Sequence, residues 1–336
     1  MKKLRKLICS FCCAVIAVAP FCGISAGAAD TDGALRTEFP GAVIPQQKNY
    51  TWQSVTSVKS IQKTRNYFII KADFGGIAED LYISFPEEGG FRLQSLSELQ
   101  KQNGTSRPAG GNNALFEPKS LEVIKYQNVS KSIIMRGGGD TVLAYTPYDG
   151  GFDLQVRSRE DARILSITHR QISFAFDRKG RAVRCMTELP LIKREAIYGG
   201  GQRFNSANQV GQLISLTNVD CWSLPEYSYK NVPLFHSNRG YSIWFNMAYT
   251  GQADIGKSDP YKYTVIFDGA NLDFYVFIGT PLENLKRYTD FTGTSGVSET
   301  WTYGFWTGAQ NNAFENTGYN DTYKNITSLI EGYNSR

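Results

Sequence analysis

The sequence predicts a mainly β protein, in which an antiparallel β-sandwich is followed by the beginning of a β/α repeat. Short β-type runs recur between residues 66 and 186, and Gly-rich or charged turns separate them without helical periodicity. Similar runs follow between residues 242 and 278. From residue 280 onward the pattern changes to a helix, an apolar run, a polar loop and a second helical pattern, which is typical of a β/α unit.

The first residues have the features of a secretory signal peptide. Four basic side chains precede an apolar stretch over residues 7–24, and small residues follow it. We therefore predict that residues 1–28 are a bacterial-type Sec signal peptide, that the protein is secreted or displayed at the cell surface, and that no stable membrane insertion remains after cleavage. An uncleaved membrane anchor is the alternative, which Pro20 and Gly23 disfavour because they interrupt the apolar stretch.

Charge and cysteine content narrow the possible partners. Loss of the signal peptide lowers the number of Lys and Arg from 36 to 32, against 31 Asp and Glu, so we expect no nucleic-acid partner. Of the cysteines, Cys185 and Cys221 remain, and they either pair or stay as buried thiols. With two histidines and no CxxC or HExxH motif, the sequence predicts no metal site and no cofactor. It does not predict an oligomeric state.

The segment after the signal peptide leads into the sandwich. Residues 29–62 are polar and are predicted to be a linker that ends in a lead-in strand. Residues 63–292 are predicted to form the β-sandwich, with a flexible excursion at 98–115. The predicted strands are 67–72, 81–85, 91–94, 121–126, 132–135, 141–145, 152–156, 164–167, 172–176, 182–186, 242–247, 263–267 and 273–278.

A long polar segment at 198–241 is the candidate for function. It is rich in glycine, amide and aromatic residues, and we interpret it as an ordered loop, because a solvated linker would not carry so much aromatic surface. Amides and carboxylates bond sugar hydroxyls, and rings cover the apolar face of a sugar. Asp220 is the acid singled out here, because it lies between Asn218 and Trp222 in the middle of the loop. Alternatively, Asp220 is a turn residue whose side chain forms a hydrogen bond with its own backbone.

The C-terminal part begins with a predicted helix. Thr280 and Glu283 form a capping box, with Pro281 at the first helical position. The apolar face predicted for this helix consists of Leu282, Leu285, Tyr288 and Phe291.

The residues after this helix are predicted to start a second domain. Residues 301–306 read as a buried strand, 307–320 as a polar loop and 321–333 as a helix. Phe314, in that loop, is either an aromatic platform for a ligand or a loop anchor. We assign residues 293–336 to the start of a (β/α)₈ barrel, and expect it to be truncated because a closed barrel takes about 250 residues.

Three other motifs are weak. Gly199–Gly201 lacks the Lys-Ser/Thr and the βαβ context of a phosphate loop. His169 and His236 could belong to a Ser-His-Asp triad only on paper, because the sequence has no GxSxG elbow. The sequence has enough acidic residues to supply a pair of carboxylates for glycoside hydrolysis. Sequence spacing cannot show, however, that two of them lie on either side of a glycosidic bond.

Seven blocks of the sequence resemble, in order, the amino-terminal portion of glycoside hydrolase family 31, and the resemblance covers roughly residues 81–336. The subtype looks nearest to bacterial α-xylosidase-like members. The blocks are 198–204 (YGGGQRF), 208–212 (NQVGQ), 216–220 (LTNVD), 229–234 (YKNVPL), 237–241 (SNRGY), 286–293 (KRYTDFTG) and 301–306 (WTYGFW).

The resemblance implies a galactose mutarotase-like β-sandwich packed on a catalytic barrel, and hydrolysis of terminal α-linked sugars with retention. It implies an α-linked oligosaccharide or glycoside as the substrate. By position, Asp220 matches the aspartate of the family's substrate loop, and Phe314 an aromatic after the first barrel strand. The chain departs from the family pattern at Gln202, where an acid is usual, and at Thr217, where tryptophan is usual.

The family's nucleophile lies in a Trp-x-Asp-Met-type motif, which this sequence does not contain. We therefore assign no catalytic residue and expect the chain alone to be inactive, as the amino-terminal part of a secreted retaining α-glycosidase. The alternatives are a stand-alone, non-catalytic carbohydrate-binding protein and a structural surface protein.

Overall fold

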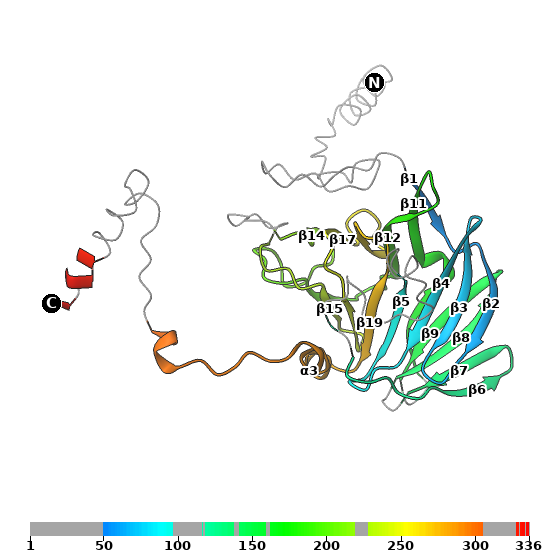
Figure 1. The fold of residues 1–336 in the computed structure, drawn as a ribbon, viewed down its shortest axis with the longest axis horizontal. Coiled ribbons are helices and arrows are strands. Elements are labelled where there is room, and N and C mark those ends of the chain that lie inside the picture. The colour runs from blue at the N-terminus through cyan, green and yellow to red at the C-terminus, as the bar shows by residue number, and fades with distance from the viewer. Residues whose placement is uncertain are drawn as a thin grey trace, which may run out of the picture. The chain divides into compact units, whose positions relative to one another are not determined.

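The computed structural model describes residues 50–96, 116, 118–137, 141–158, 162–218, 228–304, 327–328, 330–332 and 334–335. It divides the chain into two compact units, residues 1–293 and residues 294–336. The first unit contains three antiparallel sheets (Figure 1).

The largest sheet has eight strands in the order β13-β15-β16-β19-β5-β4-β3-β2. The bounds of these strands are Ile197–Gly199 (β13), Leu234–Ser237 (β15), Tyr241–Phe245 (β16), Asp273–Ile278 (β19), Phe91–Ser95 (β5), Ile77–Ser84 (β4), Phe68–Phe74 (β3) and Ser57–Lys63 (β2).

The other two sheets have six and five strands. The six-stranded order is β1-β11-β12-β18-β17-β14, with bounds Tyr50–Ser54 (β1), Ile172–Asp177 (β11), Ala182–Pro190 (β12), Lys262–Phe267 (β18), Gly251–Ile255 (β17) and Gln212–Ser215 (β14). The five-stranded order is β10-β9-β8-β7-β6, with bounds Arg163–Thr168 (β10), Gly151–Arg157 (β9), Val142–Tyr148 (β8), Ser132–Arg136 (β7) and Lys125–Val129 (β6). A single 3₁₀ turn, η1 (His169–Gln171), joins β10 to β11.

The core lies between the eight-stranded sheet and the two smaller sheets. Phe74 of β3 contacts Phe174 of β11 with ring centroids 5.2 Å apart. On the same strand, Phe68 lies 5.1 Å from Tyr145 of β8. Because β3 packs against both smaller sheets, they form one layer together, and the predicted antiparallel sandwich is confirmed.

Helix α3 (Pro281–Thr292) has the predicted capping box and proline, but its buried face differs from the prediction. Tyr288 and Phe291 pack on the outer face of the eight-stranded sheet, whereas the side chains of Leu282 and Leu285 are exposed. The fully buried Asn284 explains the rotation of the helix. Its amide donates to Ser242 Oγ at 2.9 Å, so a polar contact fixes which side of α3 faces the sheet.

The prediction of a strand at 301–306 is wrong for its first residues, because the structure has a 3₁₀ turn there, η2 (Thr300–Tyr303). Trp301 and Tyr303 are exposed. A barrel strand is held by hydrogen bonds to neighbouring strands, and no strand among the described residues pairs with η2. Residues 305–306 lie outside the described ranges, while those described between 327 and 334 are helical.

Cys185 is a free thiol in the interior of β12. It is fully buried, and burial raises the pKa of the thiol, so it behaves as a small core residue. Cys221 lies outside the described residues. Within the described ranges, no helix has both the length and the apolar character needed to cross a bilayer.

Candidate functional site

The segment 198–241 crosses between the two layers of the sandwich. It starts in β13, and its last residues belong to β15 and to the beginning of β16, all in the eight-stranded sheet. By contrast, β14 in its middle is an edge strand of the six-stranded sheet. The predicted long loop is therefore divided by short strands. Among the described residues, those that remain irregular are 200–211, 216–218, 228–233 and 238–240. Residues 219–227 lie outside the described residues.

The glycine run at the start of this segment allows its backbone to pack closely against the backbone around Lys230 and Leu234. Gly199, Gly200 and Gly201 all have positive φ angles, of 115°, 86° and 96°. A Cβ atom on Gly201 would lie 2.1 Å from the carbonyl oxygen of Lys230, and one on Gly199 would lie 2.2 Å from that of Leu234. The N–H of Gly200 donates to this same Leu234 oxygen at 3.1 Å. The run therefore joins two parts of the segment and does not form a phosphate cradle.

Asn218 and Ser228 face each other across an isolated parallel bridge. Asn231 bonds both sides of this bridge: its Nδ2 donates to the carbonyl oxygens of Thr217 and Ser228, at 2.8 Å each, and to Asn218 Oδ1 at 2.9 Å. Arg203 donates from Nη2 to the Ser215 carbonyl oxygen at 2.5 Å and to Asn231 Oδ1. We call residues 199–203, 215–218 and 228–232 the stem.

Three aromatic side chains are exposed at and beside the stem. Tyr198, Phe204 and Tyr229 are 40%, 57% and 53% exposed, although the surrounding strands are largely buried. The ammonium group of Lys230 lies 5.7 Å from the centroid of the Tyr229 ring. Exposed rings beside amide and hydroxyl groups can stack on the apolar face of a sugar.

The predicted site residues Asp220 and Phe314 both lie outside the described residues, so their roles stay predictions. The two departures from the family pattern are described and belong to the stem. The Gln202 N–H donates to Lys230 O at 3.2 Å, and the carbonyl oxygen of Thr217 accepts from Asn231. Sequence reasoning missed Arg203 and Asn231, because one cation and one amide in a polar loop are usually solvated.

The two histidines have structural environments. His169 is buried, and its Nδ1 lies 3.2 Å from the carbonyl oxygen of Phe152. His236 Nδ1 lies 2.7 Å from Ser242 Oγ, and burial lowers the pKa of His236. Ser242 is fully buried and also bonds Asn284 of α3, so no substrate reaches it. This hydrogen-bonded chain holds α3 on the sheet.

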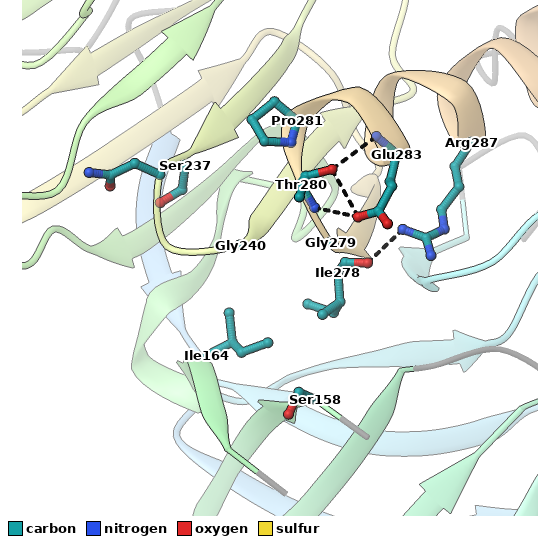
Figure 2. Close-up of a pocket in the computed structure, with 11 residues that line it drawn as sticks. Ser158, Ile164, Ser237, Gly240, Ile278, Gly279, Thr280, Pro281, Glu283 and Arg287 are labelled. Carbon is teal, nitrogen blue, oxygen red and sulfur yellow. Dashed lines mark hydrogen bonds between the residues drawn. The ribbon is translucent and has the colours of Figure 1, made fainter. Parts of the chain in front are cut away.

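A pocket of about 540 Å³ opens beside the start of α3 (Figure 2). Its charged side chains already have structural partners. Glu283 accepts from the N–H and the hydroxyl of Thr280 at 2.7 and 2.9 Å, and these bonds lower the pKa of Glu283. Arg287 donates to the carbonyl oxygen of Ile278 at 2.5 Å. We assign this pocket no ligand. In the described part of the chain, no group of three or more His, Cys, Asp or Glu could hold a metal ion.

Comparison with known proteins places this fold in a family. The profile of the glycosyl hydrolase 31 N-terminal galactose mutarotase-like domain matches residues 80–254, which is just over half of the chain. An alpha-xylosidase from Emericella nidulans is 30% identical over 154 residues, which are 45% of this chain and 19% of that protein. Alpha-xylosidase XylQ from Lactiplantibacillus pentosus is 34% identical over 113 residues, 33% of this chain and 15% of that protein.

A solved structure shows the same fold. The cycloalternan-forming enzyme from Listeria monocytogenes, in complex with a pentasaccharide substrate, has a TM-score of 0.63 at 20% identity, over 76% of this chain and 24% of that protein. The chain spans about a fifth or less of the length of the two alpha-xylosidases. It carries the family's N-terminal sandwich domain, and the chain belongs to glycoside hydrolase family 31.

Proposed function

We propose that this chain is the amino-terminal part of a secreted retaining α-glycosidase that hydrolyses terminal α-linked sugars, and that segment 198–241 contributes to substrate binding. The observation that carries the proposal is the stem. It brings three stretches of chain together, two of which flank residues 219–227 in the sequence, and exposes aromatic rings beside them. The alpha-xylosidases among the relatives support a xyloside as the ligand, and Alpha-glucosidase 2 from Bacillus thermoamyloliquefaciens supports a glucoside.

Asp220 is the proposed ligand contact. It follows Asn218 by two residues, and a carboxylate there can accept hydrogen bonds from two vicinal sugar hydroxyls. We assign no carboxylate of this chain to bond cleavage, because retention needs two carboxyl groups about 5 Å apart and the sequence lacks the nucleophile motif of the family. The proposed role of the chain is thus to select and hold the substrate.

The substitution Asp220→Asn tests this role. We expect it to weaken the binding of p-nitrophenyl α-xyloside or α-glucoside about tenfold to a hundredfold, because a hydrogen bond to a charged group contributes about 1.5–3 kcal/mol. Calorimetric titration of the purified chain measures the affinity. Asp290→Asn, on the exposed pair with Lys286 in α3, is the matched control. Equal affinities for Asp220→Asn and the unmodified chain would refute the contact, and release of p-nitrophenol above a blank would refute the non-catalytic assignment.

We also propose that residues 1–28 direct export and are removed. The support is the basic start of the sequence and the apolar stretch behind it. Terminal sequencing of the protein recovered from the culture medium should then find a first residue near Ala29. Recovery of the intact Met1 terminus with the cell membranes would show an anchor instead.

A further inference from the structure

Two kinds of contact hold helix α3 on the eight-stranded sheet. The aromatic contacts come from Tyr288 and Phe291, whose ring centroids lie 5.1 and 5.6 Å from that of Trp244. The polar contact comes from Asn284, which is fully buried between the helix and the sheet. The aromatic contacts contain no group that titrates between pH 5 and 8. The polar contact therefore decides whether the packing of α3 responds to pH in this range.

The orientation of the Asn284 amide is fixed by partners that can act in only one way. Its Oδ1 accepts from Arg287 Nη1 at 2.8 Å, and a guanidinium is only a donor. Its Nδ2 donates at 3.1 Å to the carbonyl oxygen of Gly279, which is only an acceptor. The bond of 2.9 Å between this Nδ2 and Ser242 Oγ therefore has the hydroxyl oxygen as its acceptor.

Ser242 passes this direction on to His236. Because the hydroxyl oxygen accepts from Asn284, the hydroxyl hydrogen is left for the second partner, His236 Nδ1, at 2.7 Å. Ser242 is fully buried, so a hydroxyl hydrogen without an acceptor at this position is unfavourable. The chain of hydrogen bonds from Arg287 to His236 is thus complete only when Nδ1 of the histidine carries no proton.

We propose that His236 is an acid-sensitive latch for α3, and that protonation of its Nδ1 breaks the bond from Ser242 and weakens the docking of the helix on the sheet. An imidazolium has N–H donors on both nitrogens. Its Nδ1–H would face the oxygen of Ser242 and leave the hydroxyl hydrogen without an acceptor. This latch is independent of the proposed binding of sugar.

The charged and titratable groups around His236 leave its neutral form favoured. Tyr198 of β13 pairs with it across the sheet, and Arg239 lies in the turn between β15 and β16. On α3, Arg287 carries a positive charge, and Glu283 is engaged in the helix cap. Burial lowers the pKa of His236 below its ordinary value of 6.5. Because release of α3 restores the ordinary pKa, docking is complete above about pH 6.5 and weakens as the pH falls below it.

The test measures amide hydrogen exchange by mass spectrometry at pH 7.5 and pH 5.0, with rates corrected for the intrinsic effect of pH. In the unmodified chain, the protection of residues 281–292 should fall about tenfold at pH 5.0. The upper limit is about thirtyfold, which applies if His236 titrates normally only after α3 is released. Glu283 stays mostly ionised at pH 5.0, because its hydrogen bonds lower its pKa below 4.5. Protection of β3 and β8 should not change.

Two variants separate the latch from a general effect of acid. His236→Asn places an amide oxygen, which does not titrate, near the position of Nδ1. It should keep the protection of α3 at pH 7.5 and lose less than about twofold in acid. Ser242→Ala removes the hydroxyl that joins Asn284 to His236, so the protection of α3 should already be low at pH 7.5 and change little with pH. Asp290→Asn, on the exposed face of α3, is the control and should behave like the unmodified chain.

Equal protection of α3 at the two pH values in the unmodified chain would overturn the proposal. An acid effect of full size in His236→Asn would also overturn it, because another group would then be responsible. Loss of protection that extends to β3 and β8 would mean general acid unfolding and would contradict the latch. If His236→Asn does not fold, Ser242→Ala decides, since a full acid effect in that variant is incompatible with the latch. Failure of both variants to fold at pH 7.5 would show a general structural role instead.

Discussion

The substitution Gly201→Ala is expected to lower the free energy of unfolding by about 3 kcal/mol or more. Two costs add at this position. Its φ angle of 96° lies in a region that L side chains rarely adopt, which costs about 1–3 kcal/mol. The new Cβ would also lie 2.1 Å from the carbonyl oxygen of Lys230 and 2.9 Å from Asn231 Cα. Both atoms belong to the backbone, so a change of rotamer cannot relieve the clash and the stem must open.

Gly76 is a matched control for this substitution. Its φ angle of 99° is nearly the same, but nothing lies within 4 Å of the Cβ position. Gly76→Ala should therefore show the conformational cost alone, and Gly201→Ala should be less stable than it by about 2 kcal/mol. Urea denaturation followed by circular dichroism measures both values. Equal losses at the two positions would mean that the close approach of the two chains contributes nothing to stability.

The sandwich could be predicted because most of its strands carry a local signal, whereas the short strands β13, β14, β15 and β17 do not and were not predicted. Alternating apolar residues mark β9 and the start of β18, and turn residues mark most strand ends. The pairing of strands far apart in the sequence carries no such signal. The β19 strand pairs with β5 about 180 residues earlier, and the buried pair between Arg92 and Asp273 on these strands connects two residues that look like ordinary surface charges in the sequence.

The candidate site was predictable in part. Composition indicated that 198–241 is an ordered polar segment, but the close backbone packing at Gly199–Gly201 was not predicted. The stem itself was missed, because the bonds of Asn231 depend on a bridge that forms only in three dimensions. The face of α3 was assigned wrongly for a similar reason: periodicity counts apolar residues, whereas Asn284 and its partner Ser242 decide the rotation of the helix.

Breaking the buried ion pair of Arg92 and Asp273 is the second change for which we expect a large loss of stability. Both side chains are only 3% exposed, and Nε and Nη2 of Arg92 donate to the two carboxylate oxygens at 2.8 and 2.6 Å. The guanidinium lies over the ring of Tyr275, 5.1 Å from its centroid, and that ring stacks on Trp244 at 4.8 Å. Trp244 in turn contacts Tyr288 of α3, so the pair underlies the packing of the helix.

Asp273→Asn is therefore expected to lower the free energy of unfolding by about 3–5 kcal/mol, because it leaves the Arg92 charge buried without the carboxylate that neutralises it. Asp290→Asn, which removes the carboxylate of an exposed pair in α3, should cost less than about 1 kcal/mol. Replacing both partners, as in Arg92→Met with Asp273→Leu, should recover much of the stability, since neither charge of this pair is then left buried without its partner. Urea denaturation gives the free energy of unfolding of each variant, and this separates the cost of the uncompensated charge from the cost of lost packing. If the double variant is as unstable as Asp273→Asn, the loss comes from packing around Tyr275 and the uncompensated charge is not its cause.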